Sequence, residues 1–154
     1  MGRVADGVSC AGGKITGVVP DYLDVDGAIF EKCTELIITE TLRDRKRLMD
    51  EKSDAVVAMV GGVGTLEEFM EMLALKQLCR HNKPVVILNT NDYYHHLVKM
   101  LEEIIVQKFA KPASADLYYI AKTPAEAIDY IKNYKPTHTV IKKLRYIKTE
   151  EEAK

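Results

Sequence analysis

Residues 53–68 read SDAVVAMVGGVGTLEE: an apolar run, a group of glycines and the start of a helix-forming segment. The run Ala55–Val60 is apolar at every position, which is typical of a strand covered on both faces. We expect the following helix to open at Thr65. In open α/β sheets, the turn between a strand and the next helix lies at the carboxyl edge of the sheet, where ligands bind.

The same alternation of strand and helix continues on both sides of this segment. Short runs rich in β-branched residues predict further strands at Ile15–Val19, Leu36–Thr39, Val85–Asn89 and Leu117–Ile120. Good helix formers, with apolar positions every three or four residues, predict helices at Arg43–Glu51, Leu66–Cys79, Tyr93–Gln107 and Pro124–Asn133. Thr123 is the expected N-cap of the last helix. The sequence therefore predicts an α/β fold with a doubly wound, Rossmann-like parallel sheet in three layers.

The length and composition fit one compact domain, since the 154 residues are 47% hydrophobic and 29% charged. We expect a single nucleotide-binding domain over residues 1–140 and a solvated, charged tail over residues 141–154. Met1–Cys10 reads as the end of a helix that runs into Gly12 and Gly13, with no strand before it. The first βαβ unit of a doubly wound fold is therefore expected to be absent from this chain.

Several classes of function are excluded by charge and residue usage. The 22 Lys and Arg are balanced by 23 Asp and Glu and are spread along the chain, so no nucleic-acid partner is expected. No apolar run is long enough for a membrane span or a signal peptide, which predicts a cytoplasmic protein with no membrane partner. Cys10, Cys33 and Cys79 form no C-x-x-C pair, so reduced and mostly buried thiols are expected.

The glycines at positions 61, 62 and 64 would let backbone amides approach a ligand closely. Free amides at a helix start, together with the positive end of the helix dipole, form a site for phosphate. Thr65 and Glu68 also match the S/T-x-x-E capping box, and the spacing alone favours that structural interpretation. The segment is neither a P-loop nor a G-x-G-x-x-G dinucleotide turn.

A basic group occupies the start of an earlier helix, in LRDRKRLM over Leu42–Met49. Cations there oppose the helix dipole unless an anion or an acidic neighbour compensates, although a solvated basic face would explain any one of them. Both this group and the glycines follow strands predicted to be neighbours, Leu36–Thr39 and Ala55–Val60. We therefore expect Arg45, Lys46 and the glycine turn to face one cleft at the carboxyl edge of the sheet.

These motifs together resemble the LOG (Lonely Guy) family, long mislabelled as lysine decarboxylases. The resemblance rests on the Arg45-Lys46 pair, the Ser53-Asp54 spacer and the G-G-x-G-T-x-x-E motif of Gly61–Glu68. It continues through residues 75–94 and reaches back to Met1-Gly2. Val60 stands where the family usually has Pro, and the amino-terminal unit that supplies another glycine-rich turn in the family is missing.

The resemblance implies a nucleotide 5′-monophosphate N-glycosidase that releases adenine or an N6-modified adenine (a cytokinin) and ribose 5-phosphate, without a cofactor. It implies catalytic roles for Arg45 and Glu68 and a homodimer or higher homo-oligomer. The substrate-binding residues it implies are Arg45, Lys46, Gly61, Gly62, Val63, Gly64, Thr65, Leu66, Glu67 and Glu68.

Two other functions stay open at this point. One is a non-catalytic module that binds a nucleotide or another phosphorylated cofactor. The other is a pyridoxal phosphate-dependent lysine decarboxylase, for which neither a Schiff-base lysine nor a pyridinium partner can be assigned. No metal site is expected, because His95 and His96 lack the i, i+4 spacing of a metal pair and His81 and His138 stand alone.

Overall fold

The computed structural model describes residues 1–23 and 32–136. The chain divides into two compact units, Met1–Ser53 and Asp54–Lys154. The single domain expected over residues 1–140 stays a prediction, as does the adjacency of Leu36–Thr39 and Ala55–Val60, which belong to different units. The charged tail expected over residues 141–154 lies outside the described residues.

The first unit contains a pair of parallel strands with a helix packed against both. Its elements are α1 (Gly2–Cys10), β1 (Thr16–Pro20), the 3₁₀ turn η1 (Asp21–Leu23), β2 (Glu35–Thr39) and α2 (Leu42–Lys52). The amino-terminal helix expected from the sequence is confirmed. It ends where Gly12 adopts a φ of +72°, which lets the Gly13 amide donate to the Val8 carbonyl at 2.9 Å.

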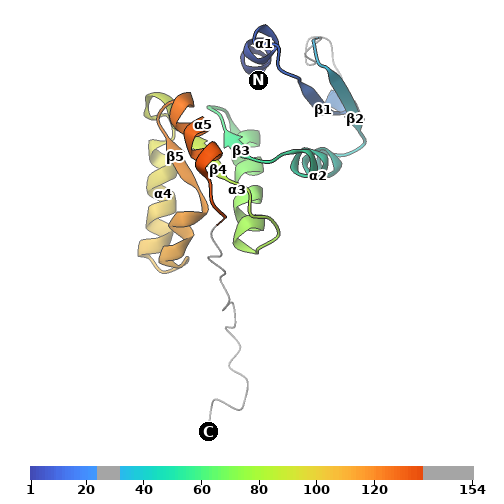
Figure 1. The fold of residues 1–154 in the computed structure, drawn as a ribbon. Coiled ribbons are helices and arrows are strands. Elements are labelled where there is room, and N and C mark those ends of the chain that lie inside the picture. The colour runs from blue at the N-terminus through green and yellow to red at the C-terminus, as the bar shows by residue number, and fades with distance from the viewer. Residues whose placement is uncertain (24–31, 137–154) are drawn as a thin grey trace. The chain divides into compact units, whose positions relative to one another are not determined.

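The second unit contains a three-stranded parallel sheet in the order β3-β4-β5 (Figure 1). Its strands are β3 (Val56–Ala58), β4 (Val85–Leu88) and β5 (Tyr119–Ala121). The helices are α3 (Val63–Gln77), α4 (His95–Val106) and α5 (Pro124–Asn133), with 3₁₀ turns η2 (Thr90–Asp92) and η3 (Pro112–Leu117). All five predicted strands and all four predicted helices are confirmed; the ends are shifted in each except α5, whose bounds are those predicted.

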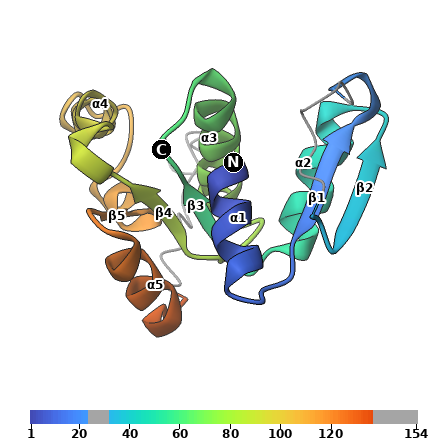
Figure 2. The same cartoon turned by 90° about the horizontal axis from the view of Figure 1, so that it is seen from above.

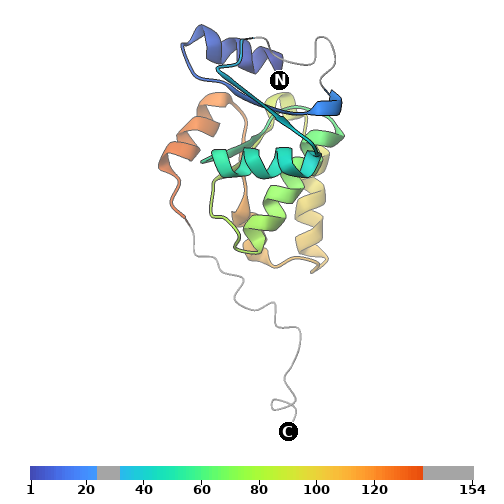
Figure 3. The same ribbon diagram turned by 90° about the vertical axis from the view of Figure 1, so that its right-hand side faces the viewer.

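Helices cover both faces of this sheet, with α3 and α4 on one side and α5 on the other (Figures 2 and 3). The central strand β4 shows why, because its side chains alternate between two apolar clusters. Val85 and Ile87 pack with residues of α3 and α4, whereas Val86 and Leu88 pack with Ala127 of α5. The predicted α/β class with a Rossmann-like, three-layer arrangement is confirmed.

The expected start of α3 is wrong. The helix begins at Val63 with Gly62 as its N-cap, so Thr65 is its third residue rather than its cap. Gly62 has extended backbone angles (φ −97°, ψ −153°), and glycine is among the residues accepted at an N-cap. Glycine has a low helix propensity, which favours a longer loop, but the helix nevertheless begins before Gly64.

The expectation of mostly buried thiols is also wrong. Cys10 and Cys79 are exposed, and Cys33 is half-buried. Cys10 is the last residue of α1. Cys79 follows the end of α3 in a left-handed conformation (φ 58°), where the next amide donates to the Leu75 carbonyl at 2.9 Å. Both exposed thiols thus stand at helix ends and outside the apolar clusters of the core.

Candidate functional site

The glycine loop, defined here as Gly61–Thr65, joins the end of β3 to the first turn of α3. The N-cap and first three residues of an α-helix carry amides without an intrahelical acceptor, and here these are Gly62 to Thr65. No side chain caps them. The amides thus stand at the positive end of the α3 dipole, at the carboxyl edge of the parallel sheet.

The glycines of the loop differ in the space that is available for a side chain. A Cβ on Gly61 would overlap the Thr65 hydroxyl and lie 3.0 Å from Thr65 Cβ, so this position has no room for a side chain. A Cβ on Gly62 or Gly64 would meet nothing within 4 Å. Neither of these two glycines has a positive φ. The packing of the chain therefore requires Gly61 but leaves open space at Gly62 and Gly64.

Two tyrosines from the turn after β4 tether the end of β3 and the glycine loop. Tyr93 Oη donates to the Gly61 carbonyl at 2.8 Å, and Tyr94 Oη donates to the Met59 carbonyl at 2.6 Å. The two rings meet edge to face with centroids 4.9 Å apart. Burial raises the pKa of the Tyr94 phenol above its ordinary value, so this hydroxyl remains a donor at neutral pH.

The turn that carries these tyrosines is itself held by Asn89. The side chain of Asn89 accepts from the Tyr94 amide at 2.7 Å and donates to Asp92 at 3.0 Å. Asn91 and Asp92 both adopt left-handed angles, with φ of 52° and 57°. The side-chain acceptor at the start of α4 is thus Asn89, which precedes both of these residues. Sequence reasoning missed the tethers, whose signal was the adjacent tyrosines behind the Asn-rich turn.

Glu68 lies half-buried on the second turn of α3, three residues after Thr65. Residues three apart are neighbours on a helix surface, so the carboxylate starts from the same side of α3 as Thr65. Leu66 packs against the core cluster of α3 and α4, which leaves only its backbone for a ligand. Glu67 is exposed, as is Val63, whose side chain is 83% exposed.

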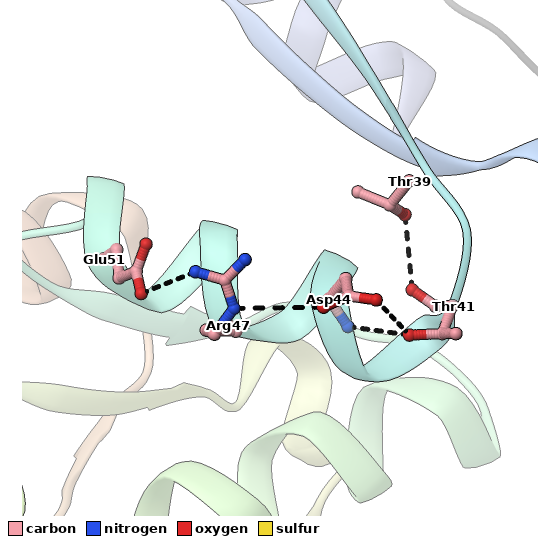
Figure 4. Close-up of polar contacts among 5 residues, drawn as sticks. All are labelled: Thr39, Thr41, Asp44, Arg47 and Glu51. Carbon is pink, nitrogen blue, oxygen red and sulfur yellow. Dashed lines mark hydrogen bonds and ion pairs between the residues drawn. The ribbon is translucent and has the colours of Figure 1, made fainter.

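The basic residues at the start of α2 in the first unit differ in the groups that they contact. Thr41 caps the helix, accepting from the Asp44 amide at 3.1 Å and donating to the Asp44 carboxylate at 2.6 Å (Figure 4). Arg47 pairs with Glu51 at 2.8 Å and lies 3.9 Å from Asp44. Arg47 therefore belongs to a solvated network of charges, which is the ordinary explanation given above.

Arg45 points to a different part of the same unit. Its Nε donates to the Val18 carbonyl of β1 at 3.0 Å, and both Arg45 and Lys46 are half-buried. The structure thus fixes the stem of the Arg45 guanidinium against a strand. Since Arg45 and Lys46 lie in the first unit and Gly61–Glu68 in the second, the cleft expected to contain both stays a prediction.

Histidine and acidic side chains form no metal-binding group in the described part of the chain. His81 links α3 to the segment before β4, with Nε2 at 2.9 Å from the Met72 carbonyl and Nδ1 accepting from the Lys83 amide at 3.2 Å. Within residues 1–23 and 32–136, no three His, Cys, Asp or Glu side chains are grouped to hold a metal ion. No helix in these ranges has the length and apolarity needed to cross a membrane.

A parallel sheet between helices, with a glycine turn at its carboxyl edge, makes this chain a Rossmann-like α/β protein. Within that class, the family described as "Possible lysine decarboxylase" matches residues 1–131. The chain belongs to this family.

Relatives with established names are similar over most of this chain. A cytokinin riboside 5′-monophosphate phosphoribohydrolase of Rhodococcoides fascians is 38% identical over 86% of this chain and 68% of its own length. A cytokinin riboside 5′-monophosphate phosphoribohydrolase of Arabidopsis thaliana is 35% identical over 95% of this chain and 64% of its own length. A probable enzyme of the same name from Oryza sativa subsp. japonica is 34% identical over 95% of this chain and 60% of its own length. The chain thus spans roughly two thirds or less of their lengths, and the resemblance to the LOG family is confirmed.

Proposed function

We propose that this chain is a phosphoribohydrolase that cleaves the N-glycosidic bond of a nucleoside 5′-monophosphate. The observation that carries the proposal is the uncapped start of α3, where the amides of Gly62 to Thr65 have no side-chain cap and two glycines leave open space. A phosphate needs several N–H donors and favours the positive end of a helix dipole. The names of the relatives give the same ligand class.

The reaction adds water across the bond between C1′ of the ribose and the ring nitrogen of the base. The water oxygen bonds to C1′, the C–N bond breaks, and the base leaves with a proton as ribose 5-phosphate forms. Positive charge develops on the ribose in such a transition state, and a carboxylate beside it is stabilising. We assign this role to Glu68, on the helix whose first amides hold the phosphate.

Cations complete the proposed site. Arg45 would assist the leaving base or orient Glu68, and Lys46 would add positive charge near the phosphate. The contact between Arg45 Nε and the Val18 carbonyl supports such a role, because it limits the positions the guanidinium can reach. The other proposed binding residues are Gly61, Gly62, Val63, Gly64, Thr65, Leu66, Glu67 and Glu68.

The test is chromatographic detection of free base after incubation with AMP and, separately, with N6-isopentenyladenosine monophosphate. Glu68→Gln is the matched control, because it keeps the size of the side chain and removes its charge. Release from either nucleotide that is lost in the control supports the proposal. Binding of both nucleotides without release by the wild-type chain would instead favour a non-catalytic binding module.

Three accompanying features are proposed with this activity: a cytoplasmic location, no cofactor and a homodimer or higher homo-oligomer. Apolar side chains at the surface of α4 and just beyond it suit a subunit contact, since Met100 is 58%, Val106 68% and Phe109 86% exposed. Light scattering of the purified chain would measure the oligomeric state. An absorbance scan for bound pyridoxal phosphate would test the decarboxylase chemistry in the family's description.

A further inference from the structure

The orientation of one peptide group in the glycine loop is fixed from a neighbouring turn. All peptide bonds in the described residues are trans, so the Gly61 carbonyl and the Gly62 N–H of one planar group point in opposite directions. Tyr93 Oη holds the Gly61 carbonyl at 2.8 Å. The hydroxyl of Tyr93 therefore sets the direction in which Gly62, the first of the proposed phosphate-binding residues, presents its amide.

This peptide group is the part of the loop most able to turn. It lies between two glycines, whose backbone torsions are less restricted than those of other residues. The Thr65 side chain fills the space beside the Gly61 α-carbon, which limits Gly61 on that side. Gly62 has no neighbour within 4 Å of its Cβ position, so nothing comparable restrains it. The hydrogen bond from Tyr93 is thus the restraint that acts on this peptide plane from outside α3.

The position of Tyr93 is fixed by contacts within its own turn rather than by burial in the core. Tyr93 is 54% exposed as a residue, whereas Tyr94 is 3% exposed and is anchored in the core cluster. The ring of Tyr94 supports that of Tyr93 edge to face, and Asn89 holds the Tyr94 amide. A half-exposed ring whose hydroxyl is bonded to a loop carbonyl contributes little to the core, so its value lies in the position of the loop.

We infer that Tyr93 is a positioning residue of the phosphate site, acting through the Gly61 carbonyl on the Gly62 amide. The inference rests on the proposed function. It assigns to the turn after β4 a part in recognising the phosphate of the substrate.

The test compares Tyr93→Phe with the wild-type chain for AMP, which carries the phosphate, and adenosine, which lacks it. Loss of one hydrogen bond should raise the Kd for AMP about fivefold and leave the Kd for adenosine unchanged. In turnover, KM for AMP should rise by a similar factor with little change in kcat. A variant with wild-type affinity for AMP, or with equal losses for AMP and adenosine, would overturn the inference.

Tyr94→Phe is the matched control, since it also removes a tyrosine hydroxyl bonded to a backbone carbonyl. That carbonyl belongs to Met59, and the same hydroxyl also faces the Gly61 amide; neither group is among the amides of Gly62 to Thr65 that are proposed to hold the phosphate. Tyr94→Phe should lower thermal stability and keep the ratio of AMP to adenosine affinity. If it changes that ratio as much as Tyr93→Phe does, the effect is a general loosening of the turn and the inference fails.

A ligand-free measurement separates this inference from the proposed function. In ¹⁵N relaxation of the wild-type chain, the Gly62 amide should be as rigid as the first turn of α3, and in Tyr93→Phe it should become mobile. Unchanged mobility overturns the positioning role, whatever the enzyme does. A wild-type chain that neither binds nor cleaves AMP refutes the proposed function, and the role of Tyr93 in phosphate binding falls with it.

Discussion

The starts of α3 and α5 contain the same four-residue pattern, Thr-x-x-Glu, and use it differently. At α5, Thr123 is the N-cap and accepts from the Glu126 amide at 3.2 Å, while the Glu126 carboxylate accepts from the Lys122 amide at 2.7 Å. At α3, Thr65 and Glu68 lie inside a helix whose N-cap is Gly62. Both helices follow strands of one sheet, so the contrast is not one of position in the fold.

The two helix starts differ in whether the side chains of the chain itself satisfy the first amides. The α5 pattern satisfies amides of its own chain, which is worth about 1 kcal/mol. The α3 pattern begins at Thr65, three residues after the N-cap Gly62, so it does not cap the first amides of that helix. The uncapped start of α3, rather than the capped start of α5, is therefore the phosphate site that we propose.

The first prediction compares the turnover of AMP by variants of Glu68 and Glu126, the two glutamates of the Thr-x-x-Glu patterns. Gln can replace Glu in a capping box, so Glu126→Gln should leave turnover of AMP unchanged. Glu68→Gln should lower kcat by about 10²-fold or more, because the charge beside the ribose is lost. Steady-state kinetics of both variants would measure this. Equal turnover in the two would mean that Glu68 is only structural.

The second prediction compares how substitution of Gly61 and of Gly64 changes the free energy of unfolding. Gly61→Ala places a methyl group against the Thr65 hydroxyl, and it should lower the free energy of unfolding by about 1 to 3 kcal/mol. Urea denaturation followed by circular dichroism measures this loss. A wild-type midpoint in Gly61→Ala would show that the loop can move away from Thr65 at little cost.

The opposite result is expected at Gly64, which lies inside the first turn of α3 and has open space around it. Ala is the better helix former by about 1 kcal/mol, so Gly64→Ala should be as stable as the wild-type chain or more stable. The added methyl group should nonetheless weaken AMP binding about tenfold, if phosphate approaches the amides closely. Calorimetric titration with AMP would show it, and unchanged affinity would place the phosphate elsewhere.

The smallest effect compares the two threonines directly. Thr123→Ala removes an N-cap and should cost about 1 kcal/mol of unfolding free energy. Thr65→Ala removes a hydroxyl that caps nothing and should cost less than half as much. Urea midpoints of the two variants give the comparison, and a larger loss at Thr65 would contradict the assignment of Gly62 as the N-cap.

Most of the fold could be predicted from local patterns, because each element carries its own signal. The strand β4 was visible as an unbroken apolar run, and it is buried on both faces. The cap at Thr123 was visible from Thr-Pro-x-Glu. The start of α3 was not, since a glycine N-cap followed by another glycine in the first turn has the composition of a loop.

The candidate site could be predicted only as far as it is continuous in sequence. Gly61 to Glu68 form one strand-to-helix turn, and the motif located it. The bond between Tyr93 and Gly61 joins residues 32 apart in the chain and depends on the neighbouring positions of β3 and β4 in the sheet. The adjacent tyrosines indicate that this turn carries hydrogen-bond donors, but no periodicity or spacing identifies the carbonyl that each of them bonds.

The amides of β4 should exchange with solvent more slowly than those of the other described strands, because β4 lies in the centre of its sheet. This strand pairs on both edges with β3 and β5, and Val85, Val86 and Ile87 are completely buried. Amides of such a strand exchange with solvent only when the whole unit opens, whereas exposed turns exchange by local fluctuation. The turn that holds the glycine loop leaves directly from β4, so its anchor belongs to the slowest-exchanging part of the unit.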